Sequence, residues 1–315
     1  TACGDTDDDE TTEGAAAEET GDTATGDGAE DGPVTIEHAF GSTTLEEVPE
    51  VIVSLDMQWT DALLALDEVP DGYVADPFVE GGTYPWQDLP EDVATIEYSD
   101  SLPLEAIAEL DPDLILVSWQ APDAASYESL AAIAPTLPLL GDRQVDHWQD
   151  QVTALGTALR KEDEATAVVD GVQEQVEALA AELPGLEGKT YAMANYVPGD
   201  MIYVVADPED GANLFFEDLG LTIDPEILAE ADGVSGRTEL SLEQAGMLDS
   251  DLLVVFSMEG DVSELVGWDQ LPAVQSGAVA DLDYAPVTAL NTPSALSIPY
   301  VMEQLRPALE AAAAA

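Results

Sequence analysis

Four short runs of apolar residues stand out along the chain. They read "VIVSL" (51–55), "DLILVS" (113–118), "TYAMAN" (190–195) and "DLLVVFS" (251–257). Within each run the apolar residues are mostly consecutive, which is typical of parallel strands covered on both faces. A helical pattern, "TDALLALDEV" (60–69), follows the first run. Strands that alternate with helices in this way predict an α/β fold.

A longer helical pattern, "EDEATAVVDGVQEQVEALAAELPG", lies between the second and third runs. Its apolar residues recur at spacings of four and three and form one stripe, which consists of Val168, Val172, Val176, Leu179 and Leu183. The Pro184-Gly185 pair ends it. A rod of about 20 residues spans roughly 30 Å, enough to connect two lobes. Periodicity alone does not distinguish such a connection from an ordinary crossover helix.

The chain contains an internal repeat. "LPLEAIAELDPDLILV" (102–117) and "LSLEQAGMLDSDLLVV" (240–255) align without gaps and are identical at eight of sixteen positions. Each predicts a helix start with a glutamate, an Asp-x-Asp turn and a buried strand. Helix–strand units share composition, so convergence is one explanation. The matched Glu105 and Glu243 favour the other, that the chain has two similar lobes.

Residues 4–33 consist mainly of Asp, Glu, Thr, Gly and Ala. Such a segment cannot bury enough apolar surface to offset its conformational entropy. The first β-branched and aromatic residues come in "VTIEHAF" (34–40), where we place the start of the folded part. We therefore predict that residues 1–33 are an acidic, disordered tether.

Cys3 is the only cysteine, so it cannot form an intramolecular disulfide. Thr1-Ala2-Cys3 resembles the end of a lipobox. We expect a signal peptide before it and a lipid on Cys3 that anchors the protein to the membrane. A surface thiol without a role is the alternative.

The charge is extreme, with 67 acidic residues against 6 basic ones and a formal net charge of −61. No basic patch is available to bind phosphates, which excludes a nucleic acid as partner. The acidic surface predicts adaptation to a very salty exterior, because salt screens its self-repulsion. Calcium sites would be another use for the acids, but the chain has no EF-hand loop.

Several segments together resemble the substrate-binding lipoproteins of ABC importers for iron–siderophore complexes, with vitamin B12-binding proteins as relatives. The resemblance covers roughly residues 34–310 and rests on the order and spacing of "GSTTLEEVPEVIVSL", "LPLEAIAELDPDLILVS", "LAAIAPT", "WQDQVTALGTAL", "LSLEQAGMLDSDLLVVF", "WDQLPAVQSGAVADLD" and "SIPYVMEQLRPAL". The sequence departs from this family where members often carry a basic residue, since Glu50 is followed here by Val51.

The resemblance implies two α/β lobes joined by one long rigid helix, with a ligand cleft between them, as in class III periplasmic binding proteins. The expected division is an N-terminal lobe (34–160), a linking helix (161–185) and a C-terminal lobe (186–315). It also implies that Glu105 and Glu243 each dock onto one permease subunit. A simple helix cap is the alternative role for both glutamates.

Candidate ligand contacts follow from the rule that open α/β sheets bind ligands beyond the carboxyl ends of their strands. Side chains of this kind are Gln58, Trp59, Trp119, Tyr196 and Met258, and the loop "GGTYPWQ" adds Tyr84 and Trp86. Aromatic walls suit a large organic chelate, although core packing is the alternative for each residue. Arg143 and Arg237 are placed where they could pair with anionic oxygens of a ferric complex or with neighbouring acids.

No catalytic motif is present. The two histidines, His38 and His147, are too few for a zinc or manganese site. We predict an extracytoplasmic, monomeric receptor that binds a ferric siderophore without a cofactor, because the iron arrives already chelated, and that delivers it to an ABC permease. A binding protein for cobalamin or haem is the nearest alternative, and a secreted hydrolase built on His147 is more distant.

Overall fold

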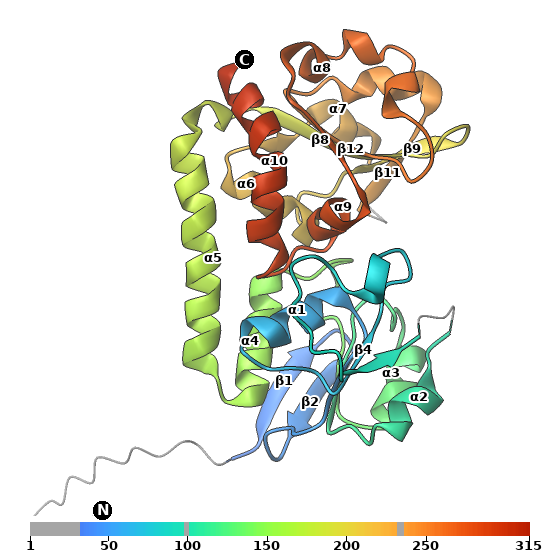
Figure 1. Cartoon of the computed structure of the whole chain (residues 1–315), viewed down its shortest axis with the longest axis vertical. Coiled ribbons are helices and arrows are strands. Elements are labelled where there is room, and N and C mark those ends of the chain that lie inside the picture. The colour runs from blue at the N-terminus through green and yellow to red at the C-terminus, as the bar shows by residue number, and fades with distance from the viewer. Residues whose placement is uncertain (1–31, 98–100, 232–235) are drawn as a thin grey trace, which may run out of the picture. The chain divides into compact units, whose positions relative to one another are not determined.

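The computed structural model describes residues 32–97, 101–231 and 236–315, and Pro33–Ala315 forms one compact unit (Figure 1). Cys3 and nearly all of the predicted tether lie outside the described residues. Among the helices of the described ranges, none combines the length and the apolar character needed to cross a membrane.

The N-terminal half contains a five-stranded sheet in which every neighbouring pair is parallel. Its strands, in the order β5-β4-β3-β6-β7, are Ala94–Ile96, Gly72–Val74, Ile52–Ser54, Leu114–Leu116 and Thr136–Leu137. An antiparallel hairpin, β1 (Val34–His38) and β2 (Gly41–Leu45), precedes it. The helices of this half are α1 (Met57–Ala65), α2 (Leu104–Glu109), α3 (Ala124–Ala131), α4 (Trp148–Leu159) and the short 3₁₀ helix η1 (Glu80–Gly82). We call the region from β1 to α4 the N-terminal lobe.

The C-terminal half contains a mixed sheet with the order β11-β9-β8-β12-β13, and β10 pairs with β8. Its strands are β8 (Thr190–Tyr196), β9 (Met201–Val205), β10 (Thr222–Ile223), β11 (Arg237–Ser241), β12 (Leu252–Phe256) and β13 (Val279–Leu282). Its α-helices are α6 (Leu214–Asp218), α7 (Pro225–Glu230), α8 (Pro272–Ser276), α9 (Tyr284–Asn291) and α10 (Ser297–Ala314), and its 3₁₀ helices are η3 (Gly211–Asn213), η4 (Leu242–Leu248), η5 (Val262–Glu264) and η6 (Trp268–Gln270). We call the region from β8 to α10 the C-terminal lobe.

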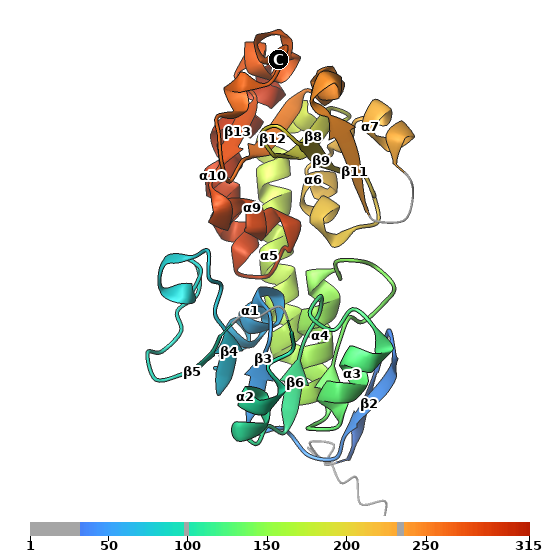
Figure 2. The ribbon, with the colours of Figure 1, turned by 90° about the vertical axis from the view of Figure 1, so that its right-hand side faces the viewer.

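One helix, α5 (Glu162–Glu182), runs alongside both lobes (Figures 1 and 2). It packs on α4 of the N-terminal lobe and on α6 and α10 of the C-terminal lobe. Three residues of the predicted stripe, Val172, Val176 and Leu179, are buried. The helix ends at the predicted place, before the short 3₁₀ helix η2 (Pro184–Leu186).

The four predicted strands are present as β3, β6, β8 and β12, which confirms the α/β class. Alternate residues of the apolar runs belong to different cores. Leu114 and Leu116 join the main buried cluster, whereas Ile115 joins a smaller cluster on the other face of the sheet. Because both faces of the sheet are covered, an uninterrupted apolar run is the pattern that this position requires.

The two repeat segments form equivalent structures. The helical segments α2 and η4 begin at the matched positions Leu104 and Leu242, and the strands β6 and β12 also begin at matched positions. In the first repeat the Asp113 carboxylate accepts from the backbone N–H of Val51 (2.9 Å), just before β3. In the second, Asp251 accepts from the N–H of Thr190 (2.9 Å), the first residue of β8. Each aspartate therefore fixes the start of the parallel strand next to its own.

Candidate functional site

A cavity of about 470 Å³ lies between the two lobes, a volume within the usual range of small-molecule sites. Most of its wall comes from the N-terminal lobe. The lining residues are Leu55, Asp56, Met57, Gln58, Thr60, Tyr73, Val74, Ala75, Asp76, Pro77, Phe78, Gly82, Tyr84, Gln87, Trp119, Gln120, Asn195, Phe256, Met258, Tyr284, Val287, Thr288, Asn291 and Thr292.

The buried carboxylate of Asp56 organises the carboxyl ends of β3 and β6. It caps α1 by accepting from the Trp59 N–H (3.2 Å), and it also accepts from the Ser118 N–H (2.6 Å) beyond β6. Burial raises the pKa of Asp56 to about 6, while the two backbone donors act in the opposite direction. Asp56 thus ties the first turn of α1 to the segment that carries Trp119.

The loop after β4 brings the two lobes together at Asp76. This carboxylate accepts from the hydroxyl of Tyr84, in the same loop, and from the hydroxyl of Tyr284 (2.9 Å), the first residue of α9. Burial, followed by the neighbouring Asp76, raises the pKa of Tyr84 and raises that of Tyr284 to about 12. Both phenols therefore remain protonated donors at neutral pH. Phe78 packs on the Tyr284 ring, with ring centroids 5.5 Å apart.

A second connection between the lobes surrounds Asp61 of α1, whose side chain is fully buried. Its carboxylate accepts from Trp86 Nε1 (2.8 Å) and Gln87 Nε2 (2.6 Å) in the N-terminal lobe. The hydroxyl of Ser294, between α9 and α10, also donates to it. Burial raises the pKa of Asp61 to about 7 against the effect of these three donors. We call this group the Asp61 network.

Four of the predicted ligand contacts line the cavity: Gln58, Tyr84, Trp119 and Met258. Trp119 and Met258 follow β6 and β12 closely and keep about half of their surface exposed, at 50% and 56%. The Gln58 amide instead donates to the backbone oxygen of Pro293 (2.7 Å). Gln58 therefore holds the lobes together at the edge of the cavity.

The structure contradicts the predicted place of Trp59 and Tyr196 in the cavity wall, since both lie in the main buried cluster. Successive helix residues point about 100° apart, so the face of α1 that presents Gln58 turns Trp59 into the core. Successive strand residues point to opposite faces, so Asn195 reaches the cavity and Tyr196 does not.

Trp86 also lies outside the cavity lining. Its ring stacks on Tyr84, with centroids 4.8 Å apart, and packs against Tyr300 of α10 (5.0 Å). With its indole N–H directed to Asp61, Trp86 supports the wall instead of forming it.

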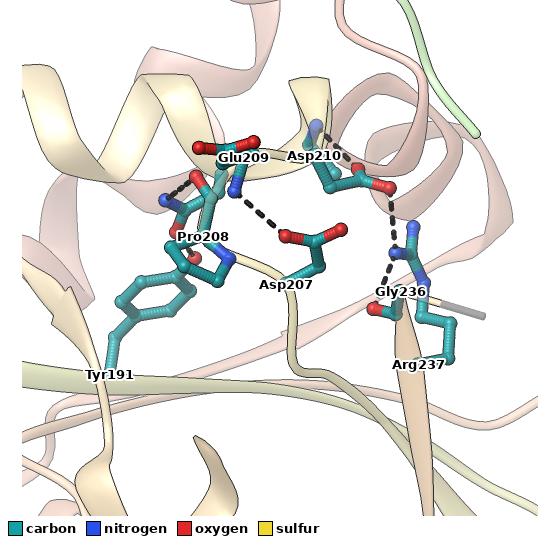
Figure 3. Close-up of polar contacts among 9 residues, drawn as sticks. Tyr191, Asp207, Pro208, Glu209, Asp210, Gly236 and Arg237 are labelled. Carbon is teal, nitrogen blue, oxygen red and sulfur yellow. Dashed lines mark hydrogen bonds and ion pairs between the residues drawn. The ribbon is translucent and has the colours of Figure 1, made fainter. Parts of the chain in front are cut away.

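Neither of the predicted arginines lines the cavity. Figure 3 shows Arg237 paired with the buried Asp210, with 3.2 Å between Nη1 and Oδ2, and bonded to the carbonyl of Gly236 (3.1 Å). Burial raises the pKa of Asp210, and the Arg237 charge opposes this shift. Arg143 is half-buried and interacts electrostatically with Asp146. Both arginines thus have acidic partners, the alternative that the sequence left open.

Several lining residues were not among the predicted contacts, above all Asp76, Phe78 and Tyr284. A usable signal existed for Tyr284, because it follows the end of β13 by two residues, as Trp119 follows β6 closely. The same signal existed for Asp76, which follows the end of β4 by two residues. Phe78 lies farther along this loop, next to Tyr284 of α9, and no comparable signal marks it.

The matched glutamates Glu105 and Glu243 are exposed in the first turns of α2 and η4. Gln244, not Glu243, makes the predicted capping contact, since its side chain accepts from the Ser241 N–H (3.0 Å). Within the described residues, no group of three or more His, Cys, Asp or Glu side chains is arranged to hold a metal ion.

A family model described as periplasmic binding protein matches residues 52–286. The chain belongs to this family. It is therefore a binding protein and not an enzyme, as the sequence predicted, and the hydrolase alternative is set aside.

Two proteins of Bacillus subtilis are similar to this chain over most of its length. The probable siderophore-binding lipoprotein YfiY is 29% identical over 272 residues, which cover 79% of this chain and 80% of the relative. The Fe(3+)-citrate-binding protein YfmC is 28% identical over 249 residues, 77% of this chain and 76% of the relative. These matches confirm the resemblance inferred from the sequence.

Among solved structures, the iron uptake ABC transporter substrate-binding protein PiaA from Streptococcus pneumoniae superposes with a TM-score of 0.72 at 25% identity. The match covers 90% of this chain and 100% of that one. It confirms the predicted class of fold.

Proposed function

We propose that this protein is the extracytoplasmic receptor that captures a ferric siderophore and delivers it to an ABC importer. The observation that carries the proposal is the cavity between the lobes, with Trp119, Tyr84 and Tyr284 in its wall, in a member of the periplasmic binding protein family. Its relatives YfiY and YfmC carry names that state siderophore and ferric citrate binding. Iron is cargo in this function, held by its chelator, so the receptor needs no metal ligands of its own.

The direct test is quenching of tryptophan fluorescence, because Trp119 lies in the cavity wall. Ferric catecholate, hydroxamate and carboxylate chelates, cobalamin and haemin are titrated in about 2 M KCl. The iron-free chelators are one control, and free tryptophan is the control for light absorbed by the coloured compounds themselves. We expect saturable quenching by at least one ferric chelate. Saturable quenching only by cobalamin or haemin would replace the siderophore with that ligand, and quenching by none of these compounds would refute the proposal.

We also propose that Cys3 carries the lipid that holds the receptor at the outer face of the cytoplasmic membrane. The support is the lipobox-like Thr1-Ala2-Cys3 and the acidic segment that follows it. Expressed with a lipoprotein signal peptide, the protein should fractionate with membranes, and Cys3→Ser should release it into the soluble fraction. Membrane association that Cys3→Ser leaves unchanged would contradict this proposal.

Glu105 and Glu243 are our proposed contacts with the two permease subunits. Both are exposed at matched positions of the two repeats, and within the described residues neither carboxylate makes a hydrogen bond or an ion pair. Two such contacts would sense the distance between the lobes. In a reconstituted importer, Glu105→Ala with Glu243→Ala should abolish ligand-stimulated ATP hydrolysis while ligand affinity is retained.

The matched control is Glu109→Ala with Glu239→Ala, which removes two exposed glutamates close to the same positions. This variant should stimulate ATP hydrolysis normally. Normal stimulation by the Glu105/Glu243 variant would leave both residues without a docking role.

A further inference from the structure

An anionic ligand is usually bound by basic side chains, and the cavity wall does not provide them. Two carboxylates, Asp56 and Asp76, belong to the lining, whereas no lysine, arginine or histidine does among the described residues. The segments outside the description contain none of these three residue types, so they cannot supply a basic residue either. The wall is therefore acidic and aromatic without a basic side chain.

Every basic residue of the chain is placed elsewhere. Lys161 pairs with Glu68, Lys189 with Asp251, Arg237 with Asp210 and Arg306 with Glu182, while Arg143 interacts with Asp146 and Arg160 caps the end of α4. In a chain with six basic residues, none is left in the wall to pair with carboxylate or catecholate oxygens.

The backbone does not replace the missing cation. A helix N-terminus attracts anions through its unpaired N–H groups and its dipole. The N-terminus of α1 does face the cavity, because Met57 and Gln58 line it. Its N-cap is Asp56, however, whose carboxylate already accepts from the Trp59 N–H (3.2 Å). The Asp56 carboxylate therefore already occupies this helix N-terminus.

Asp76 is the acidic group best placed to meet a ligand. It is only half-buried, and its Oδ1 atom accepts from the Phe78 N–H (2.8 Å) while its Oδ2 atom accepts from two tyrosines. The rings of Phe78, Tyr84 and Tyr284 surround it in the wall. Aromatic faces and a carboxylate both attract cations, so these groups act in the same direction.

We infer that the cavity selects ferric chelates that are neutral or positively charged, as ferric tris-hydroxamates are, against anionic tris-catecholate and citrate complexes, and that Asp76 is a specificity-determining residue. This inference rests on the proposed function and narrows its ligand class. The three hydroxamate groups balance the charge of Fe³⁺, so such a complex needs no cation from the protein. Ferric tris-catecholates retain several negative charges that this wall does not neutralise.

The test uses one chelate whose charge alone is changed. The ferric complex of a linear trihydroxamate with a free terminal amine carries one positive charge. Acetylation of the amine makes the complex neutral, and succinylation makes it negative. Affinities are measured by fluorescence quenching in about 2 M KCl, where a Debye length of about 3 Å or less screens the distant surface acids and leaves the charges of the cavity.

We expect the affinity to fall from the amine to the acetylated and then to the succinylated complex, by about tenfold overall. Asp76→Asn should reduce that ratio by about threefold or more. The matched control is Glu80→Gln, which removes a neighbouring exposed acid that does not line the cavity, and its ratio should equal that of the unmodified protein.

Equal or tighter binding of the succinylated complex would overturn the inference, and so would a ratio that Asp76→Asn leaves unchanged. Tight binding of ferric citrate or a ferric tris-catecholate with no binding of the trihydroxamates would also overturn it, although the siderophore receptor itself would stand. If no ferric chelate of any class binds, the proposed function fails first.

Discussion

The two repeat segments, 102–117 and 240–255, resemble each other where they build the fold and differ where they reach the cavity. Asp113 and Asp251 each fix the start of a neighbouring parallel strand. Beyond the strands the similarity ends, since β6 leads to an exposed tryptophan, Trp119, and β12 to an exposed methionine, Met258. The comparison indicates that the repeated positions build the scaffold, while the residues after the strands give each lobe a different side chain at the cavity.

The surface charge is a feature that the lobes share, because acidic residues are spread through both. We expect the largest of the predicted effects when the salt that screens this charge is removed. Lowering KCl from about 2 M to about 0.05 M restores repulsion among the acids and should lower the Tm by about 10 °C or more. The measurement is a thermal melt followed by circular dichroism, with sucrose at the osmolality of 2 M KCl as a control for solute exclusion. A Tm independent of salt would remove the halophilic interpretation.

The next effect concerns the Asp61 network, which joins α1 to the C-terminal lobe through Ser294. Burial raises the pKa of Asp61 from 3.8 to about 7. Between about pH 4 and pH 7 the folded state therefore binds more protons than the unfolded state. Its contribution to stability is therefore fully present below pH 4 and is lost as the pH rises to about 7, by up to about 4 kcal/mol.

Urea unfolding between pH 4 and 8 measures this loss by comparison with Asp61→Asn, which has no proton to lose. Asp61→Asn should lack this part of the pH dependence, whatever its absolute stability. Asp88→Asn, at an exposed position, is the control and should follow the unmodified protein. Parallel curves for Asp61→Asn and the unmodified protein would mean that the pKa of Asp61 is not raised in the folded state.

The third prediction compares the contributions of Trp119, after β6, and Met258, after β12, to ligand affinity. Trp119→Ala should weaken binding of the preferred ferric chelate by roughly 30-fold, since a truncated aromatic contact commonly costs about 2 kcal/mol. Met258→Ala removes a smaller, flexible side chain and should cost about fivefold or less. Both side chains are exposed, so neither substitution should shift the Tm by more than about 2 °C. Equal losses in the two variants would contradict an unequal contribution of the lobes.

The smallest predicted effect concerns the matched aspartates of the two repeat segments, Asp113 and Asp251. Asp113→Ala and Asp251→Ala each leave backbone N–H groups at a strand start without their acceptor, which should cost about 1–2 kcal/mol of unfolding free energy. The cost for Asp251 should be slightly larger, because it also pairs with Lys189 (3.1 Å). Asp111→Ala tests a neighbouring turn residue of positive φ and should be less destabilising than Asp113→Ala. A neutral Asp113→Ala beside a destabilising Asp251→Ala would show that the matched aspartates serve different purposes.

Patterns in the sequence were enough to predict the α/β class, the four buried strands, the end of α5 and the similarity of the two repeat segments. These features depend on local patterns: consecutive apolar residues where a strand is covered on both faces, a 3.6-residue period on a helix, and a proline-glycine stop. The sequence also predicted that Trp119 and Met258 lie at the cavity, because the carboxyl ends of neighbouring strands meet at one edge of a sheet.

Which of two neighbouring side chains faces the cavity depended on the tertiary structure. A rotation of about 100° per helix residue separates Gln58, at the cavity, from Trp59, in the core, and the alternation of a strand separates Asn195 from Tyr196. The tertiary structure also keeps the basic side chains out of the wall and brings Asp76 to the C-terminal lobe. Asp76 meets Tyr284 across 208 positions of sequence, and Arg237 is held by Asp210. The first pairing depends on how the lobes pack together and the second on the packing within the C-terminal lobe, and no local period in the sequence records either.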